Sequence, residues 1–135
     1  MSEPDFSGLR VLLVDDDAFL RSLTARVLKG LGFAAVAEAA DGRAALALLA
    51  REGADIALVD FRMPELDGPG FAAAVRAGTE GAAADLPIVM LSGSSDAGAI
   101  ATAEASGIDG YLVKPVKRDT VVPALADALR RRGRL

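Results

Sequence analysis

The sequence predicts an α/β fold in which five parallel strands form one sheet and five helices cover its two faces. Short apolar runs alternate five times with longer segments whose apolar residues recur at helical spacing. Glycine, proline or aspartate separates most of these segments. Strands that alternate with helices pair in parallel through right-handed crossovers. This doubly wound (βα)5 order would place the carboxyl ends of all five strands at one edge of the sheet.

The composition indicates one domain, residues 1–135, with a core of about residues 9–130. There is no cysteine, which is compatible with a reducing cytoplasm, and no histidine. The net charge of −4 argues against nucleic-acid binding by the folded body. No apolar run approaches the roughly 18 residues of a membrane helix, and the acidic N-terminus does not resemble a secretory signal. We therefore expect a cytoplasmic protein that binds neither nucleic acid nor membrane.

The first half of the chain contains two strands and two helix starts. Leu9–Val14 is an apolar run typical of a strand buried on both faces. Asp17 can cap the helix that follows, and Gly30 can end it. A weaker strand is expected at Phe33–Ala39, and Asp41-Gly42 opens the second helix.

The centre of the chain holds the third and fourth strands. Ile56–Val59 is a short apolar run, and Asp60 stands where that run ends. Gly68-Pro69 introduces the third helix, because proline is tolerated in a first helical turn. Pro87–Leu91 is the fourth strand and ends at Ser92.

The last third contains a helix, a strand and a final helix. Ser95 or Asp96 is expected to cap the fourth helix, and Tyr111–Val113 is the fifth strand, followed by Lys114-Pro115. Asp119 is expected to cap the last helix, with Pro123 inside its first turn. Four arginines are expected to complement the C-terminus of this helix and to solubilise it: Arg130, Arg131, Arg132 and Arg134.

Polar side chains end four of the five predicted strands. The first strand gives Asp15 and Asp16, the third Asp60, the fourth Ser92 and the fifth Lys114. Ligands of open α/β sheets bind at this edge, near the point where strand order reverses. Three adjacent carboxylates repel one another and need a cation or a proton. An all-oxygen site favours a hard ion, Mg²⁺ or alternatively Mn²⁺.

A phosphoryl group would complete such a site. Lys114 can neutralise one phosphate oxygen, and Ser92 can donate a hydrogen bond to another. A carboxylate can itself act as the nucleophile and form an aspartyl phosphate. Asp60 is the best placed, because it stands alone on the central strand beside the acidic pair.

Five linked motifs follow one another along most of the chain. They are Val14-Asp15-Asp16-Asp17, Val59-Asp60-Phe61-Arg62-Met63-Pro64, Asp67-Gly68, Leu91-Ser92 and Gly110-Tyr111-Leu112-Val113-Lys114-Pro115. In order and spacing they resemble the receiver domain of bacterial two-component response regulators, in its single-domain, chemotaxis-regulator-like form. The resemblance implies a flavodoxin-like fold and a cytoplasmic phosphoprotein of a two-component system.

The resemblance also implies the roles of the site residues. Asp60 would accept a phosphoryl group from a phosphohistidine on a sensor histidine kinase or histidine phosphotransferase. Asp16, Asp60 and the backbone carbonyl of Arg62 would ligate Mg²⁺ directly, and Asp15 would do so through water. Lys114 would pair with the phosphate, and the Lys114–Pro115 bond would be cis.

A switch is implied as well. Ser92 would move toward the phosphoryl group while Tyr111 turns from an exposed to a buried rotamer, which biases an existing two-state equilibrium. The readout surface would be helix four, strand five and helix five. Arg62 and Ser94 occupy positions that tune hydrolysis of the aspartyl phosphate, and Gly93 would loosen the switch loop.

The expected protein is not an enzyme beyond its own phosphotransfer and autodephosphorylation. It would signal through protein–protein contacts or a phosphorelay, as a monomer or a phosphorylation-dependent dimer, toward a target the sequence does not name. Alternatives are a receiver excised from a hybrid kinase, although the initial Met1 and short tails favour a stand-alone protein, and a receiver that signals without phosphorylation. A Mg²⁺-dependent phosphatase with an aspartyl nucleophile is disfavoured by Asp15-Asp16-Asp17-Ala18-Phe19. A flavodoxin-like flavin binder is disfavoured because acids replace the phosphate loop.

Overall fold

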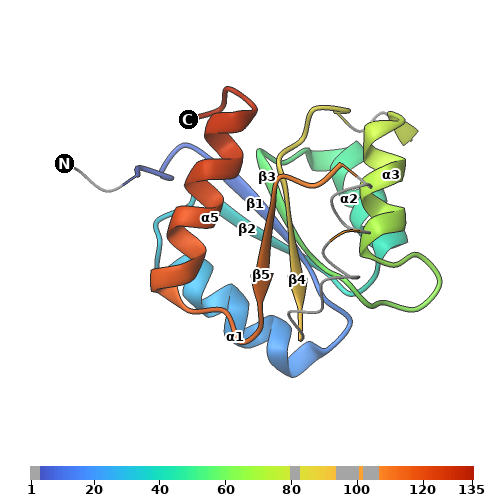
Figure 1. The fold of residues 1–135 in the computed structure, drawn as a ribbon, viewed down its shortest axis with the longest axis horizontal. Helices are drawn as coiled ribbons and strands as arrows, with labels where there is room; N and C mark the ends of the chain where they lie inside the picture. Colours follow the sequence, from blue (N-terminus) through green and yellow to red (C-terminus); the bar gives the residue numbers. More distant parts are fainter. Residues whose placement is uncertain (1–3, 80–82, 94–100, 102–106) are drawn as a thin grey trace.

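The computed structural model describes residues 4–79, 83–93, 101 and 107–135. Its strands form one parallel sheet in the order β2-β1-β3-β4-β5 (Figure 1). The strands are β1 (Arg10–Val14), β2 (Ala35–Ala39), β3 (Ile56–Asp60), β4 (Ile88–Ser92) and β5 (Gly110–Val113). The helices within the described residues are α1 (Ala18–Lys29), α2 (Gly42–Glu52), α3 (Gly68–Arg76) and α5 (Arg118–Arg131). The predicted fold class is confirmed.

The expected fourth helix lies outside the described residues, as do its candidate caps Ser95 and Asp96. Ser94 also lies outside them. Within the described residues, no helix combines the length and the apolar character needed to cross a membrane.

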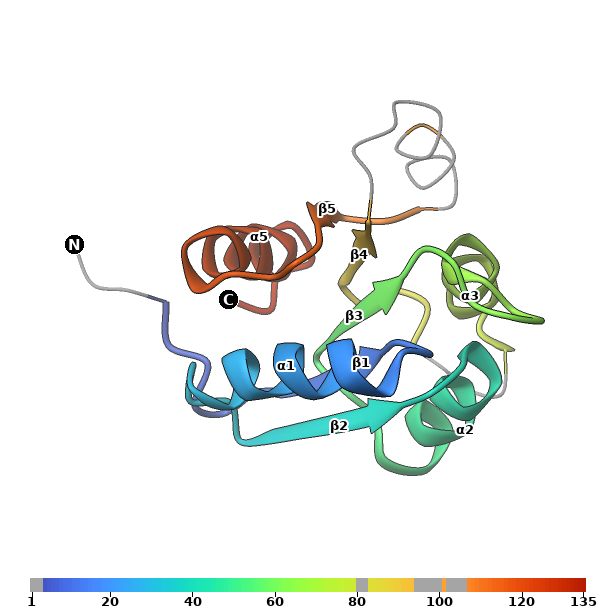
Figure 2. The same cartoon turned by 90° about the horizontal axis from the view of Figure 1, so that it is seen from below.

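Helices cover both faces of the sheet. α1 and α5 pack on one face, and α2 and α3 pack on the other (Figures 1 and 2). Every residue of β3 and β4 is buried. Burial on both faces explains why these strands are continuous apolar runs rather than alternating patterns. The strand order reverses beside β1 and β3, so their carboxyl ends form the place where a ligand is expected.

Aspartate side chains begin three of the helices. Oδ1 of Asp17 accepts a hydrogen bond from the backbone N–H of Leu20, at the start of α1. Asp41 caps α2, and Asp67 caps α3 in the same way. Each carboxylate satisfies a backbone N–H that has no partner inside the helix. The predicted cap at Asp17 is confirmed, and the second helix begins at Asp41-Gly42 as predicted.

The start of α5 differs from the prediction. Its N-cap residue is Lys117, which makes no side-chain cap hydrogen bond, so the prediction that Asp119 caps this helix is wrong. The helix begins at Arg118, which places Asp119 inside the first turn, where the helix dipole still favours a carboxylate. The earlier start also places Pro123 beyond the first turn, inside the helix.

Candidate functional site

The carboxyl ends of β1, β3 and β5 bring two acids and a cation together. Nζ of Lys114 lies 3.2 Å from Oδ1 of Asp60 and 3.6 Å from Oδ2 of Asp15. Asp15 is fully buried and Asp60 is 6% exposed. Salt screens buried charges much less than exposed ones. The ammonium group therefore balances part of a net negative charge held at the strand ends.

Asp15 is only partly satisfied by the protein. Its Oδ1 accepts a hydrogen bond from the backbone N–H of Asp17 at 2.9 Å. Its Oδ2 has no hydrogen-bond partner among the described residues, although Lys114 lies nearby. Nη1 of Arg21 donates to the Asp15 carbonyl at 2.7 Å and so holds the backbone at this point. A buried carboxylate oxygen without a hydrogen bond is costly, and a bound cation would relieve that cost.

Asp60 has a perturbed acidity. The pKa of its carboxyl group is raised to about 6, mainly by burial; Lys114 lowers this pKa, whereas the charges of Asp15 and Asp16 act in the same direction as burial. Burial and the neighbouring carboxylates therefore make ionisation of Asp60 less favourable in the absence of an added cation.

The donor set fits a divalent cation. Asp15, Asp16 and Asp60 can each offer a carboxylate oxygen, and these three oxygens lie within 4.8 Å of one another. Asp16 is exposed, so the cluster is open to solvent. Hard oxygen ligands suit Mg²⁺, which retains water and takes one or two carboxylates. The orphaned oxygen of Asp15 and the all-oxygen set make the cluster compatible with Mg²⁺.

Two neighbouring clefts open beside Asp60. The first has a volume of about 450 Å³ and is lined by Leu20, Asp60, Phe61, Arg62, Ser92, Gly93, Lys114 and Pro115. The second, of about 350 Å³, is lined by Asp16, Phe61, Arg62, Met63, Pro64 and Asp67. The Arg62 side chain is exposed, and its guanidinium carbon lies 5.8 Å from the centre of the Phe61 ring. The space beside Asp60 can therefore admit a phosphoryl group.

The structure brings most of the predicted site residues to this cleft. Ser92, Arg62 and Lys114 share it with Asp60, and the Lys114–Pro115 peptide bond is cis. Tyr111 is half-buried on β5 and lines a different cleft, together with Asp109 and Arg131.

A close approach of α3 fixes the backbone at Asp60. A Cβ atom added to Gly68 would lie 2.6 Å from the Asp60 carbonyl oxygen and 3.0 Å from Cα of Phe61. The backbone N–H of Gly68 donates to the Phe61 carbonyl at 3.0 Å. Only glycine allows this approach, so Gly68 is part of the scaffold of the site.

Sequence reasoning did not identify Arg21 or Gly68 as supports of the site. Arg21 follows the Asp17 cap by one helical turn, and this spacing could have indicated a return toward the end of β1. The sequence places Gly68 at the start of a helix and in the Asp67-Gly68 motif, but its contact with Asp60 depends on tertiary packing and leaves no local signal.

Comparison with known proteins identifies the family. The sequence model of the response regulator receiver domain matches residues 11–126. The chain belongs to this family. The receiver domain is 35% identical over 107 residues to the chemotaxis protein CheY of Pseudomonas aeruginosa, covering 79% of this chain and 85% of that protein. It is also 33% identical over 122 residues to the probable transcriptional regulator ycf27 of Porphyridium aerugineum. That match covers 90% of this chain and 48% of the relative, so the receiver domain spans about half of that longer protein.

Solved structures agree with this assignment. A putative response regulator from Chloroflexus aurantiacus superposes with a TM-score of 0.84 at 30% identity, covering 92% of this chain and 99% of that one. The chain therefore has the fold of the receiver domains of two-component signalling. Its acidic cluster is compatible with Mg²⁺. This assignment favours a signalling domain over the phosphatase and flavin-binding alternatives.

Proposed function

We propose that this receiver domain accepts a phosphoryl group on Asp60 in the presence of Mg²⁺ and signals through the resulting change of its surface. The observation that supports this most strongly is the position of Asp60. Its carboxylate borders an open cleft, 3.2 Å from the Lys114 ammonium group and beside two further carboxylates.

In this reaction a phosphoryl group moves from an imidazole nitrogen of the donor to a carboxylate oxygen of Asp60. An ionised Asp60 oxygen forms a bond to phosphorus while the bond from phosphorus to the donor imidazole breaks, and the electron pair stays on the nitrogen. Lys114 neutralises a phosphoryl oxygen, and Ser92 donates a hydrogen bond to another. Asp15, Asp16, Asp60 and the Arg62 carbonyl would hold Mg²⁺, which when bound supplies positive charge next to the phosphoryl oxygens.

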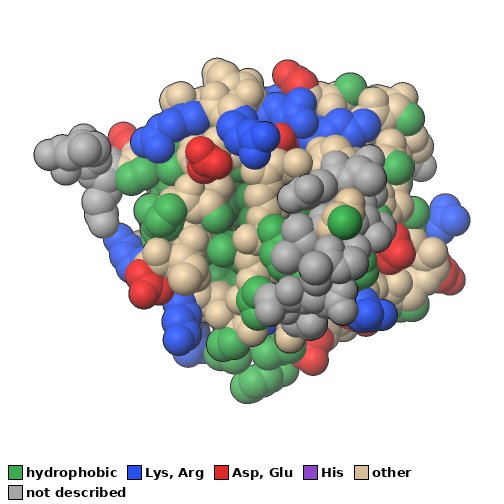
Figure 3. Space-filling model, in the orientation of Figure 1, with side chains coloured by type: hydrophobic (Ala, Val, Ile, Leu, Met, Phe, Trp, Pro, Cys, Tyr) green, Lys and Arg blue, Asp and Glu red, His purple; other side chains and the backbone are tan. Residues whose placement is uncertain are grey.

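The phosphodonor requires a docking surface beside this cleft. Receiver domains interact with histidine kinases or histidine phosphotransferases. The first two turns of α1 carry exposed apolar side chains beside this cleft. Phe19 is 71% exposed and Leu23 is also exposed. A cleft of about 310 Å³ joins this face to Lys114 and Pro115. Figure 3 shows hydrophobic side chains at the lower end of this view, over α1. We assign this apolar surface to the donor.

The output would follow the family pattern. Phosphorylation draws Ser92 toward the phosphoryl group and Tyr111 inward, which changes the surface that includes β5 and α5. A target protein, a second copy of the chain or a relay partner would read that surface. The helix-four part of this surface falls outside the described residues.

A small phosphodonor tests the proposal without a partner. The protein is incubated with acetyl phosphate, with and without Mg²⁺, and its intact mass is measured. The expected result is the gain of one phosphoryl group that needs Mg²⁺ and is lost in Asp60→Asn. Steady release of phosphate from many phosphate esters would instead support the phosphatase alternative.

A further inference from the structure

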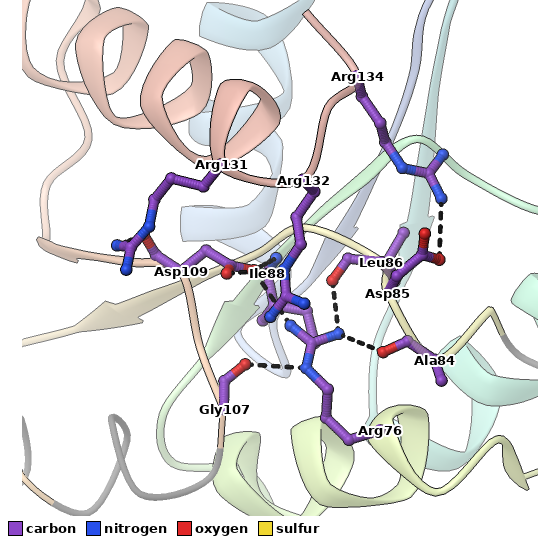
Figure 4. Close-up of polar contacts among 10 residues, drawn as sticks. All are labelled: Arg76, Ala84, Asp85, Leu86, Ile88, Gly107, Asp109, Arg131, Arg132 and Arg134. Atoms are coloured by element: carbon purple, nitrogen blue, oxygen red, sulfur yellow. Dashed lines mark hydrogen bonds and ion pairs between the residues drawn. The ribbon is translucent and has the colours of Figure 1, made fainter.

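A second group of charges lies at the opposite edge of the sheet, where the strands begin. The Asp109 side chain is 5% exposed and pairs with two arginines (Figure 4). Nη2 of Arg76 lies 3.1 Å from Oδ2 of Asp109, and Nε of Arg132 lies 2.9 Å from its Oδ1. We call Asp109, Arg76 and Arg132 the Asp109 clamp.

The clamp corrects the expectation for the terminal arginines. Arg131 donates to the Asp109 carbonyl at 3.2 Å, and Arg132 to its carboxylate. Arg134 pairs with Asp55 and Asp85. Lys and Arg side chains gather along the upper rim of the face seen in Figure 3. The C-terminal arginines therefore do more than solubilise a helix end, because three of them contact the segments that precede β3, β4 and β5.

Asp109 is also bonded to the start of β4. Its backbone N–H donates to the Ile88 carbonyl at 2.8 Å, and its Oδ2 accepts from the backbone N–H of Ile88 at 3.0 Å. One residue therefore satisfies both backbone groups of Ile88. This pairing adds a side-chain bond to the ladder between β4 and β5, directly before the first residue pair, Val89 with Gly110.

Arg76 ties this point to α3. Its Nε donates to the Gly107 carbonyl at 3.0 Å, and its Nη1 donates to the carbonyls of Leu86 and Ala84 at 2.7 and 2.9 Å. The guanidinium group therefore joins the last turn of α3 to the segments before β4 and β5 (Figure 4). A planar group with five donors can make all these bonds at once, which lysine cannot do.

β5 depends on such anchoring because it is short and lies at the sheet edge. It has four residues, and among the strands that the structure describes it pairs with β4 alone. Just beyond its far end, the backbone N–H of Lys114 donates to the Ser92 carbonyl at 2.6 Å. A change of register by one residue would turn every side chain of the strand to the opposite face. Lys114 would then no longer point toward Asp60.

We propose that the Asp109 clamp is a positioning element, which fixes the register of β5 on β4 and thereby places Lys114 against Asp60 from the opposite edge of the sheet. The catalytic meaning of this inference rests on the proposed function, whereas its geometric part does not. Asp109 touches neither phosphoryl group nor metal. It acts through the four residues of β5.

A double-mutant cycle tests this coupling. Asp109→Asn removes the carboxylate charge at the centre of the clamp at nearly constant side-chain size. We measure the affinity for beryllofluoride with Mg²⁺ and the rate of phosphorylation by acetyl phosphate. Asp109→Asn is expected to lower both by about three- to tenfold, which lies within the coupling found between residues of one network. In a Lys114→Ala background the same change is expected to have almost no further effect.

Asp85→Asn is the matched control. It makes the same charge change at the same edge, but Asp85 is 69% exposed and pairs only with Arg134 in the described residues. It is expected to leave both quantities unchanged. Equal effects of Asp109→Asn with and without Lys114 would overturn the proposal, as would equal effects of the Asp109 and Asp85 variants. If Asp109→Asn does not fold, Arg132→Gln replaces it, because it keeps Asp109 with Ile88 and Arg76. It is then expected to give a smaller loss in the same direction, again only when Lys114 is present.

Amide hydrogen exchange tests the geometric part alone. Exchange of the β5 amides, including that of Lys114, is expected to accelerate in Asp109→Asn and not in Asp85→Asn. Unchanged exchange would overturn the positioning role. If the wild-type protein failed to take up beryllofluoride or phosphoryl at all, the proposed function would fail, while the exchange result would still decide the role of the clamp.

Discussion

Lys114, which follows β5, reaches across β4 to place its ammonium group 3.2 Å from the carboxylate of Asp60 at the end of β3. The contact joins strands that are not direct neighbours. It therefore depends on the register of both intervening pairings, Asp60 with Leu91 and Ser92 with Val113. The charge balance of the site thus depends on how β3, β4 and β5 pair with one another.

Lys114→Ala should reduce phosphorylation strongly. Its removal leaves the buried carboxylates of Asp15 and Asp60 without their cation and removes the group that would neutralise a phosphoryl oxygen. We expect the rate with acetyl phosphate and Mg²⁺ to fall by about 10²-fold, the usual effect of removing one donor to a developing oxyanion. Lys114→Arg keeps the positive charge with a different shape, so its phosphorylation rate should lie between those of the wild-type protein and Lys114→Ala. An unchanged rate in Lys114→Ala would remove Lys114 from the mechanism.

Stability should depend on the ionisation of Asp60. Because burial raises its pKa to about 6 in the folded state, the folded protein retains a proton that the unfolded chain releases. The contribution of Asp60 to the free energy of unfolding therefore decreases as the pH rises through the window from about 4 to 6. At pH 7 without Mg²⁺, Asp60→Asn should be more stable than the wild-type protein, and this difference should vanish toward about pH 4.

Urea unfolding of both proteins across this pH range, in the presence of a chelator, provides the measurement. Added Mg²⁺ should stabilise the wild-type protein and have little effect on Asp60→Asn. A difference in stability that does not change with pH would show that Asp60 ionises normally.

Gly68→Ala should destabilise the fold and distort the site. The new methyl group would meet the Asp60 carbonyl oxygen at 2.6 Å, and backbone atoms cannot give way as a flexible side chain can. We expect a loss of about 1–3 kcal/mol of stability, typical of overpacking. Gly93→Ala is the control, since a Cβ atom there would meet nothing within 4 Å. Equal thermal midpoints for the two variants would refute the close-approach argument.

Arg62→Asn should change the lifetime of the aspartyl phosphate. The Arg62 side chain is exposed and lines both the cleft that contains Asp60 and the neighbouring cleft, so we expect it to affect the access of water to a phosphoryl group on Asp60. The decay of phosphorylated protein is followed after the donor is removed, with Arg43→Asn as an exposed control outside the two clefts. Identical decay of the wild-type and Arg62→Asn phosphoproteins would remove Arg62 from this role.

The site could be predicted from sequence because its residues mark the ends of strands. Asp15, Asp60 and Lys114 each follow an apolar run, and parallel pairing is sufficient to bring such positions to one edge. The order of the five motifs then identified the family. These inferences needed only local patterns and one topological rule.

The clamp could not be predicted in the same way. Asp109 precedes a strand instead of ending one, and its partners come from α3 and from beyond α5, 33 and 23 residues away. No local pattern links these positions. The prediction of a cap at Asp119 was wrong for a related reason: the sequence has an aspartate near the helix start, but the helix begins at Arg118, two residues earlier than a cap at Asp119 implies.

Phosphorylation of Asp60 is tested most directly by locating the phosphoryl group chemically. The protein is treated with acetyl phosphate and Mg²⁺, reduced with borohydride, which converts an aspartyl phosphate to homoserine, and then digested and sequenced by mass spectrometry. If Asp60 is the phosphoryl acceptor, homoserine forms at position 60 alone, and none forms when Mg²⁺ is chelated. Homoserine at Asp15 or Asp16, or its absence from every aspartate of a folded protein, would contradict this role of Asp60.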